Sequence, residues 1–106
     1  MRRKIDDLLT ELKQALRQIY GENLCNLYLY GSYATREEEP ESDVDVAIVL
    51  KQFGDYWVEI QRTSHVISEL SLKYSVTISP VRVQESDWLQ EESPFLNNVR
   101  KECIPL

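Results

Sequence analysis

The stretch YGSYATREEEPESDVDVAIV, residues 30–49, determines how the rest of the chain is interpreted. It starts where a short apolar run stops at Gly31-Ser32, and it ends in an alternating run that contains Asp43 and Asp45. Glycine lets a ligand approach the main chain closely, and a serine after it offers a hydroxyl beside backbone N–H groups. We therefore expect a phosphate-binding turn to lie beside two carboxylates, with a loop between them.

The segments on either side of this stretch alternate between helical and strand patterns. Apolar residues at helical spacing predict helices over 3–20 and 55–74. Short apolar or alternating runs predict strands over 24–30, 43–50 and 75–83. The order indicates an α/β (α+β) fold in which helices flank a small mixed β-sheet.

The sequence also predicts the surroundings of several individual side chains. Pro80 makes the third strand an edge or a bulged strand, and Ser93-Pro94 predicts the start of a short last helix. His65 and Arg82 are expected to be solvated, whereas Trp88 is equally consistent with the core and with a surface patch. The inward face of helix 55–74 is expected to carry Trp57, Ile60, Ile67, Leu70 and Tyr74.

The length and the charge distribution limit the number of domains and the classes of partner. The 106 residues predict a single domain over 1–106, with an ordinary globular composition of 42% hydrophobic and 28% charged residues. The net charge is −6, and residues 37–45 hold six acidic side chains and no basic one. Such a cluster repels phosphate backbones, so we expect no direct nucleic-acid partner.

The compartment is inferred from what the sequence contains. No apolar run reaches the roughly 18 residues of a membrane span, so we expect no membrane partner. Cys25 and Cys103 are far apart and show no metal-site spacing, which favours free thiols. We therefore expect a cytoplasmic protein.

Asp43 and Asp45 lie two positions apart on a predicted strand, so their carboxylates project from one face about 7 Å apart at the backbone. Mg²⁺ would compensate their repulsion, because its usual ligands are carboxylates and substrate phosphates. Solvated strand-end carboxylates and a plain Gly-Ser turn are the alternative interpretations. Arg36 follows Ser32 by four positions, where it either reaches a phosphate or pairs with the acidic run.

Residues 28–50 resemble the DNA polymerase β nucleotidyltransferase superfamily, whose signature is Gly-Ser, ten residues, then Asp-any-Asp. Within it, the chain is similar to the minimal nucleotidyltransferase (MNT) antitoxins of HEPN-MNT toxin-antitoxin modules. The resemblance implies a polymerase β-like fold in which Asp43 and Asp45 are catalytic and bind Mg²⁺. It also implies that Gly31 and Ser32, with Arg36 nearby, bind the nucleotide.

The activity implied by this resemblance is protein adenylylation. AMP would pass from ATP to the hydroxyl group of a tyrosine in a partner HEPN ribonuclease toxin. This modification would silence the toxin. The chain departs from the superfamily pattern because a third carboxylate is usual on a following strand, where this sequence has Thr77 or Ser79. Glu85 and Asp87 lie beyond that strand. An inactive module that inhibits its partner by complex formation alone is therefore the alternative.

Overall fold

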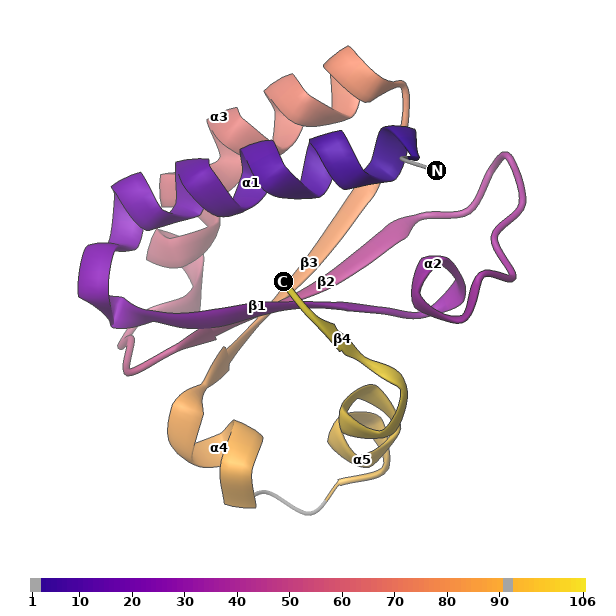
Figure 1. Ribbon diagram of the computed structural model, residues 1–106. Helices are drawn as coiled ribbons and strands as arrows, with labels where there is room; N and C mark the ends of the chain where they lie inside the picture. Colours follow the sequence, from indigo (N-terminus) through magenta and orange to yellow (C-terminus); the bar gives the residue numbers. More distant parts are fainter. Residues whose placement is uncertain (1–2, 91–92) are drawn as a thin grey trace.

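A four-stranded mixed sheet with strand order β3-β2-β1-β4 lies at the centre of the molecule (Figure 1). The computed structural model of the chain describes residues 3–90 and 93–106. β1 pairs antiparallel with β2 and with β4, and β2 pairs parallel with β3. The strands are Leu24–Tyr30 (β1), Val44–Leu50 (β2), Ile78–Gln84 (β3) and Ile104–Pro105 (β4).

Helices cover both faces of this sheet. α1 and α3 lie side by side on one face, and α4 and α5 lie on the other (Figure 1). None of the helices in the described part of the chain is long and apolar enough to cross a membrane. The helices are α1 (Lys4–Tyr20), the 3₁₀ turn η1 (Gly21–Asn23), α2 (Ser32–Thr35), α3 (Tyr56–Tyr74), α4 (Glu85–Gln90) and α5 (Pro94–Glu102).

The alternation along β2 divides the core in two. Val46 and Ile48 belong to the cluster formed with α1 and α3, and Ala47 and Val49 belong to the cluster formed with α4 and α5. Because successive side chains of a strand point to opposite faces, one apolar strand can serve both layers. Asp45 shares the parity of Ala47, so its carboxylate belongs to the α4/α5 side of the sheet.

The predicted fold class is confirmed, and the predicted helices and strands are present with small shifts at their ends. β3 is an edge strand, as Pro80 indicated, because an edge position tolerates the missing N–H donor. It begins at Ile78 rather than residue 75, since Ser75 ends α3 in the left-handed region at φ 54°. Ser93 caps α5 by accepting a hydrogen bond from the Leu96 N–H at 3.1 Å.

Two predicted surface and core assignments are wrong. Trp57 is 62% exposed rather than inward-facing, and Arg82 is buried at 8% exposure rather than solvated. The reason is that the side of α3 facing the molecule buries Glu59, Thr63 and Leu70. The Arg82 guanidinium donates to Thr63 Oγ1, which provides the polar partner that a buried charge requires.

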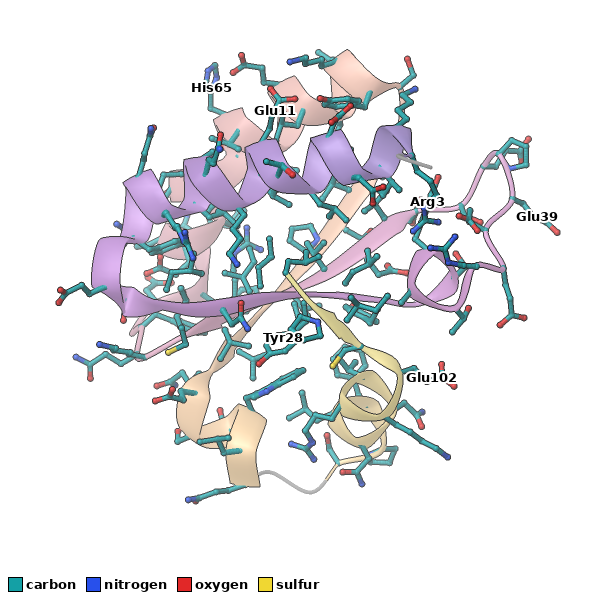
Figure 2. The ribbon with its side chains drawn as sticks, viewed as in Figure 1. Arg3, Glu11, Tyr28, Glu39, His65 and Glu102 are labelled. Atoms are coloured by element: carbon teal, nitrogen blue, oxygen red, sulfur yellow. The ribbon has the colours of Figure 1, made fainter. Side chains whose placement is uncertain are left out.

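The remaining sequence questions are answered by packing. Trp88 belongs to the core, where it stacks on Tyr28 with ring centroids 4.5 Å apart, and Figure 2 shows Tyr28 on the side of the sheet that faces α4. His65 is solvated, as predicted. Cys25 and Cys103 are half-buried free thiols.

Candidate active site

The two halves of the sequence motif meet at one end of the sheet. β1 ends at Tyr30, which pairs directly with Asp45 in the antiparallel ladder, and the chain then turns at Gly31 into α2. Figure 1 shows α2 and the beginning of β2 at this same end, joined by the loop that carries the acidic run. The register therefore places the Gly-Ser turn beside the Asp-any-Asp pair.

Gly31 is required at its position for two reasons. Its backbone has φ 74° and ψ −156°, a region that essentially only glycine occupies. A Cβ atom at Gly31 would overlap Asp45 Oδ2 and lie 3.2 Å from Asp45 Cγ. The absence of a side chain therefore allows the Asp45 carboxylate to lie directly against the main chain at the start of α2.

α2 is a single turn that begins at Ser32. The Gly31 carbonyl accepts from the N–H groups of Ala34 and Thr35 at 3.1 and 3.2 Å, which closes the turn. The first N–H groups of a helix have no carbonyl partner within it, so those of Ser32 and the next residue remain suited to an anion. Arg36 ends the turn in the left-handed region at φ 62°, with an exposed side chain.

The two aspartates differ in environment. Asp43 is exposed and Asp45 is half-buried. Burial raises the pKa of Asp45, and the charge of Asp43 raises that pKa further. The pair is therefore strained electrostatically when both carboxylates are ionised, and a bound cation would relieve this strain.

This donor set fits Mg²⁺ carried with a nucleotide. Across residues 3–90 and 93–106, no group of three or more His, Cys, Asp or Glu side chains could hold a metal ion. Two carboxylates are nevertheless the usual protein contribution where Mg²⁺ takes its other ligands from waters and substrate phosphates. Asp43 and Asp45 are the residues that would hold it.

Ser79 is the nearer to the pair of the two positions where the family resemblance implies a third carboxylate. It is the partner of Asp45 in the parallel β2–β3 ladder, and its hydroxyl donates to Asp43 Oδ2 at 3.4 Å. Thr77 is exposed and precedes β3, where its carbonyl accepts from the Val44 N–H. The neighbouring strand thus brings a neutral hydroxyl, not an acid, to the pair.

Glu85 and Asp87, the acids that follow β3 most closely, both belong to α4. Glu85 begins α4 at the other end of β3 from Ser79. It lies near Cys25 at the start of β1. The pKa of the Cys25 thiol is raised mainly by burial and, to a smaller extent, by Glu85. Glu85 is therefore excluded as a substitute for the third carboxylate.

One aromatic residue, Tyr30, borders the pair and Phe95 packs against it, and the sequence interpretation assigned neither of them to the site. Tyr30 lies next to Asp45, and its pKa is raised by burial and then by the Asp45 charge. The Tyr30 ring meets the edge of Phe95 at 6.1 Å between centroids. Only the strand register and the packing of α5 bring these residues together, and no local sequence signal indicates them.

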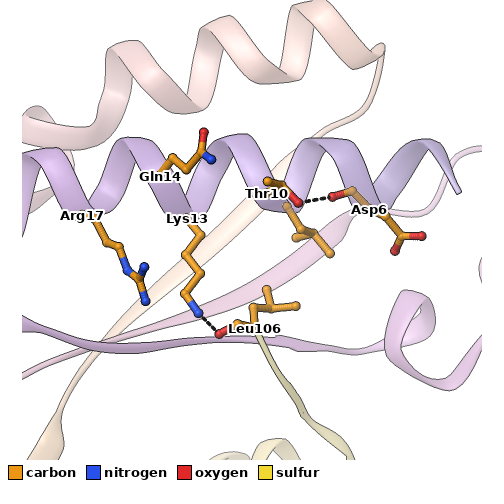
Figure 3. Close-up of a pocket in the computed structure, with 7 residues that line it drawn as sticks. Asp6, Thr10, Lys13, Gln14, Arg17 and Leu106 are labelled. Carbon is orange, nitrogen blue, oxygen red and sulfur yellow. Dashed lines mark hydrogen bonds between the residues drawn. The ribbon is translucent and has the colours of Figure 1, made fainter. Parts of the chain in front are cut away.

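A hollow of about 390 Å³ lies elsewhere, between one face of α1 and Leu106 (Figure 3). Lys13 donates to the Leu106 carbonyl oxygen there, and Arg17 and Gln14 also line it. It contains none of the predicted site residues. The nucleotide is therefore expected at the end of the sheet that carries Asp43 and Asp45, and not in this hollow.

Ser32→Ala is expected to weaken ATP binding by about 1 to 3 kcal/mol, the scale of a hydrogen bond to a charged group. The backbone donors of α2 remain, so binding should be reduced and not lost. Calorimetric titration with ATP and Mg²⁺ measures this, with exposed Ser64→Ala on α3 as the control. Equal affinities of the two variants would leave Gly31-Ser32 as an ordinary turn.

Comparison with known proteins identifies the family. Residues 10–98 match the family model "Polymerase beta, Nucleotidyltransferase". A Methanocaldococcus jannaschii protein named "Putative protein adenylyltransferase" is 36% identical over 78 residues, which are 74% of this chain and 78% of that protein.

Two crystal structures share the fold. One is a toxin-antitoxin with AMP-PNP, with a TM-score of 0.59, 20% identity and coverage of 89% of this chain and 68% of that one. The other is a spectinomycin adenyltransferase from Enterococcus faecialis with ATP and spectinomycin, with a TM-score of 0.61, 18% identity and coverage of 83% and 37%. The family resemblance predicted from residues 28–50 is confirmed, and the chain belongs to the polymerase β nucleotidyltransferase family.

Proposed function

We propose that this chain transfers AMP from ATP, in the presence of Mg²⁺, to a tyrosine hydroxyl of a HEPN-family ribonuclease toxin and thereby neutralises it. The observation that carries the proposal is the contact of the Asp45 carboxylate with Gly31 at the start of α2. This contact supports the proposal because a carboxylate suited to Mg²⁺ and backbone N–H groups suited to phosphate would then lie side by side. That arrangement suits transfer of a nucleotidyl group.

Relatives support the chemistry and the class of acceptor. A relative at 36% identity carries the name of a protein adenylyltransferase, and a structure with the same fold is a toxin-antitoxin with AMP-PNP. The resemblance of residues 28–50 to MNT antitoxins supplies the HEPN partner and the tyrosine. The acceptor hydroxyl therefore comes from a second protein.

In the proposed reaction, the start of α2 and the Ser32 hydroxyl hold the β- and γ-phosphates. Asp43 and Asp45 would hold Mg²⁺, which would stabilise charge on the phosphoryl oxygens when bound. The acceptor oxygen forms a bond to the α-phosphorus while the bond from that phosphorus to the bridging oxygen breaks. Pyrophosphate leaves, and the hydroxyl proton passes to pyrophosphate or solvent.

Ser79 favours a second candidate, an inactive module that inhibits the toxin by binding alone. A serine beside Asp43 cannot take up a proton as a third carboxylate would. The intact Gly31, Ser32, Asp43 and Asp45 favour the enzyme.

Incubation of the protein with ATP, Mg²⁺ and the product of the adjacent reading frame separates the two candidates. We expect intact-mass spectrometry to show additions of about 329 Da, AMP less water, or multiples of it, on the partner, as nucleotidyl transfer requires. EDTA should prevent the addition. A tight complex that suppresses ribonuclease activity with no mass increment would instead establish the binding module.

A further inference from the structure

We propose that the acceptor protein docks along the outer edge of β3, in a groove lined by Phe53, Tyr56 and Phe95. The occupant is a surface segment of the acceptor that carries apolar side chains for the groove and basic side chains around it. This inference rests on the proposed function and identifies where its protein substrate binds.

The groove follows one strand edge. It has a volume of about 320 Å³, and the four consecutive residues 81–84 of β3 line it. β3 is an edge strand of the sheet, and an edge strand offers backbone N–H and C=O groups to an added chain. An extended segment of a partner therefore finds both apolar walls and main-chain partners here.

Phe95, which lines the groove, connects it to the neighbourhood of the carboxylate pair. Phe95 contacts Tyr30, and Tyr30 lies beside Asp45. Tyr56 is also close to Tyr30. It is the third cause of the raised pKa of Tyr30, and burial and the Asp45 charge have larger effects. A segment seated between Tyr56 and Phe95 thus leads toward the position where a hydroxyl must approach the nucleotide.

The exposed apolar surface is larger than a nucleobase would cover. Tyr56, Trp57 and Val58 form the first turn of α3 and are 45%, 62% and 43% exposed, and Phe95 is 49% exposed. Exposed aromatic residues beside one another are characteristic of protein–protein contacts. The extent of this patch favours a protein occupant over the adenosine part of ATP.

Charge indicates the chemistry of the partner. Asp87 lines the groove and Asp55 caps α3 beside Tyr56, whereas the cation in the lining, Arg82, is buried. The loop that leads into β2 adds Glu37, Glu39 and Glu41, and its Glu38 pairs with Arg3. Glu39 projects from this loop away from the body of the molecule (Figure 2). Basic groups on the partner would complement these acids, so complex formation should weaken as salt concentration rises.

Two groove variants are tested, Tyr56→Ser in the lining itself and Trp57→Ser in the exposed patch beside it. Both positions lie in the first turn of α3, where serine is well tolerated. Leu72→Ser is the control: Leu72 is 81% exposed on the same helix, about 22 Å along its axis from Trp57. The readouts are the dissociation constant for the product of the adjacent reading frame, measured without ATP, and the KM for ATP. We expect the dissociation constant to rise about tenfold in each groove variant and less than about twofold in the control.

Each other result contradicts the assignment. Equal affinities in all three variants would show that the acceptor binds elsewhere, and a raised KM for ATP with unchanged acceptor affinity would assign the groove to the nucleoside. A wild-type protein that binds this acceptor but transfers nothing would overturn the proposed AMP transfer alone. The three affinities would then still decide whether the groove is the docking site.

Discussion

Asp45→Asn is expected to reduce adenylyl transfer by about a thousandfold or more. The amide removes one of two charged ligands for Mg²⁺, and metal stabilisation of phosphoryl charge contributes several kcal/mol to such reactions. Transfer is measured by the mass increment on the acceptor over time. Glu22→Gln is the control, because it removes one exposed negative charge on η1, away from Asp45.

The same variant should not lose stability. Burial and Asp43 raise the pKa of Asp45 in the folded protein, so ionisation of this carboxyl opposes folding. The contribution of this carboxyl to the free energy of unfolding is greatest below the ordinary pKa of an aspartate. It is lost as pH rises through the raised pKa of the folded protein.

Metal-free Asp45→Asn should therefore unfold at the same or a higher temperature than wild type at pH 7. The difference should disappear at acidic pH, as thermal unfolding at several pH values will show. Added ATP and Mg²⁺ should stabilise the wild type much more than the variant, because ligand binding stabilises the folded state. Undiminished transfer by Asp45→Asn would refute the metal assignment.

Gly31→Ala is expected to abolish transfer and to destabilise the fold by about 1 to 3 kcal/mol, the cost of holding a non-glycine residue in this backbone region. The new methyl group would also displace the Asp45 carboxylate from the main chain, because it would overlap Oδ2. Activity assays and denaturant unfolding measure the two effects.

Two other glycines separate strain from crowding. Gly21 has φ 56° with no atom near a potential Cβ, so Gly21→Ala should cost stability and leave activity intact. Gly54 has open space and no positive φ that disfavours a side chain, so Gly54→Ala should change neither. Full activity of Gly31→Ala would contradict the close approach of Asp45 to Gly31 as a requirement for transfer.

Local patterns in the sequence predicted most of the scaffold. The helix over 3–20, the strand over 24–30 and the strand over 43–50 depend on the period of neighbouring apolar residues, which a sequence displays directly. α4 and β4 were not predicted. β4 has only two residues, and only its pairing with β1 makes it a strand. Arg82 was misplaced because its burial depends on Thr63, nineteen positions earlier.

The sequence by itself determined the motif of this protein: Gly31-Ser32, the ten-residue spacing, and Asp43 and Asp45 on one strand. It could do so because a turn between two antiparallel strands returns the chain to the same end of the sheet. The tertiary structure alone decided what surrounds that motif. Ser79 reaches Asp43 through the parallel register of β2 and β3, and Tyr56 and Phe95 line one groove although 39 positions separate them. Such contacts depend on strand register and helix packing between distant segments, which the period of local residues does not specify.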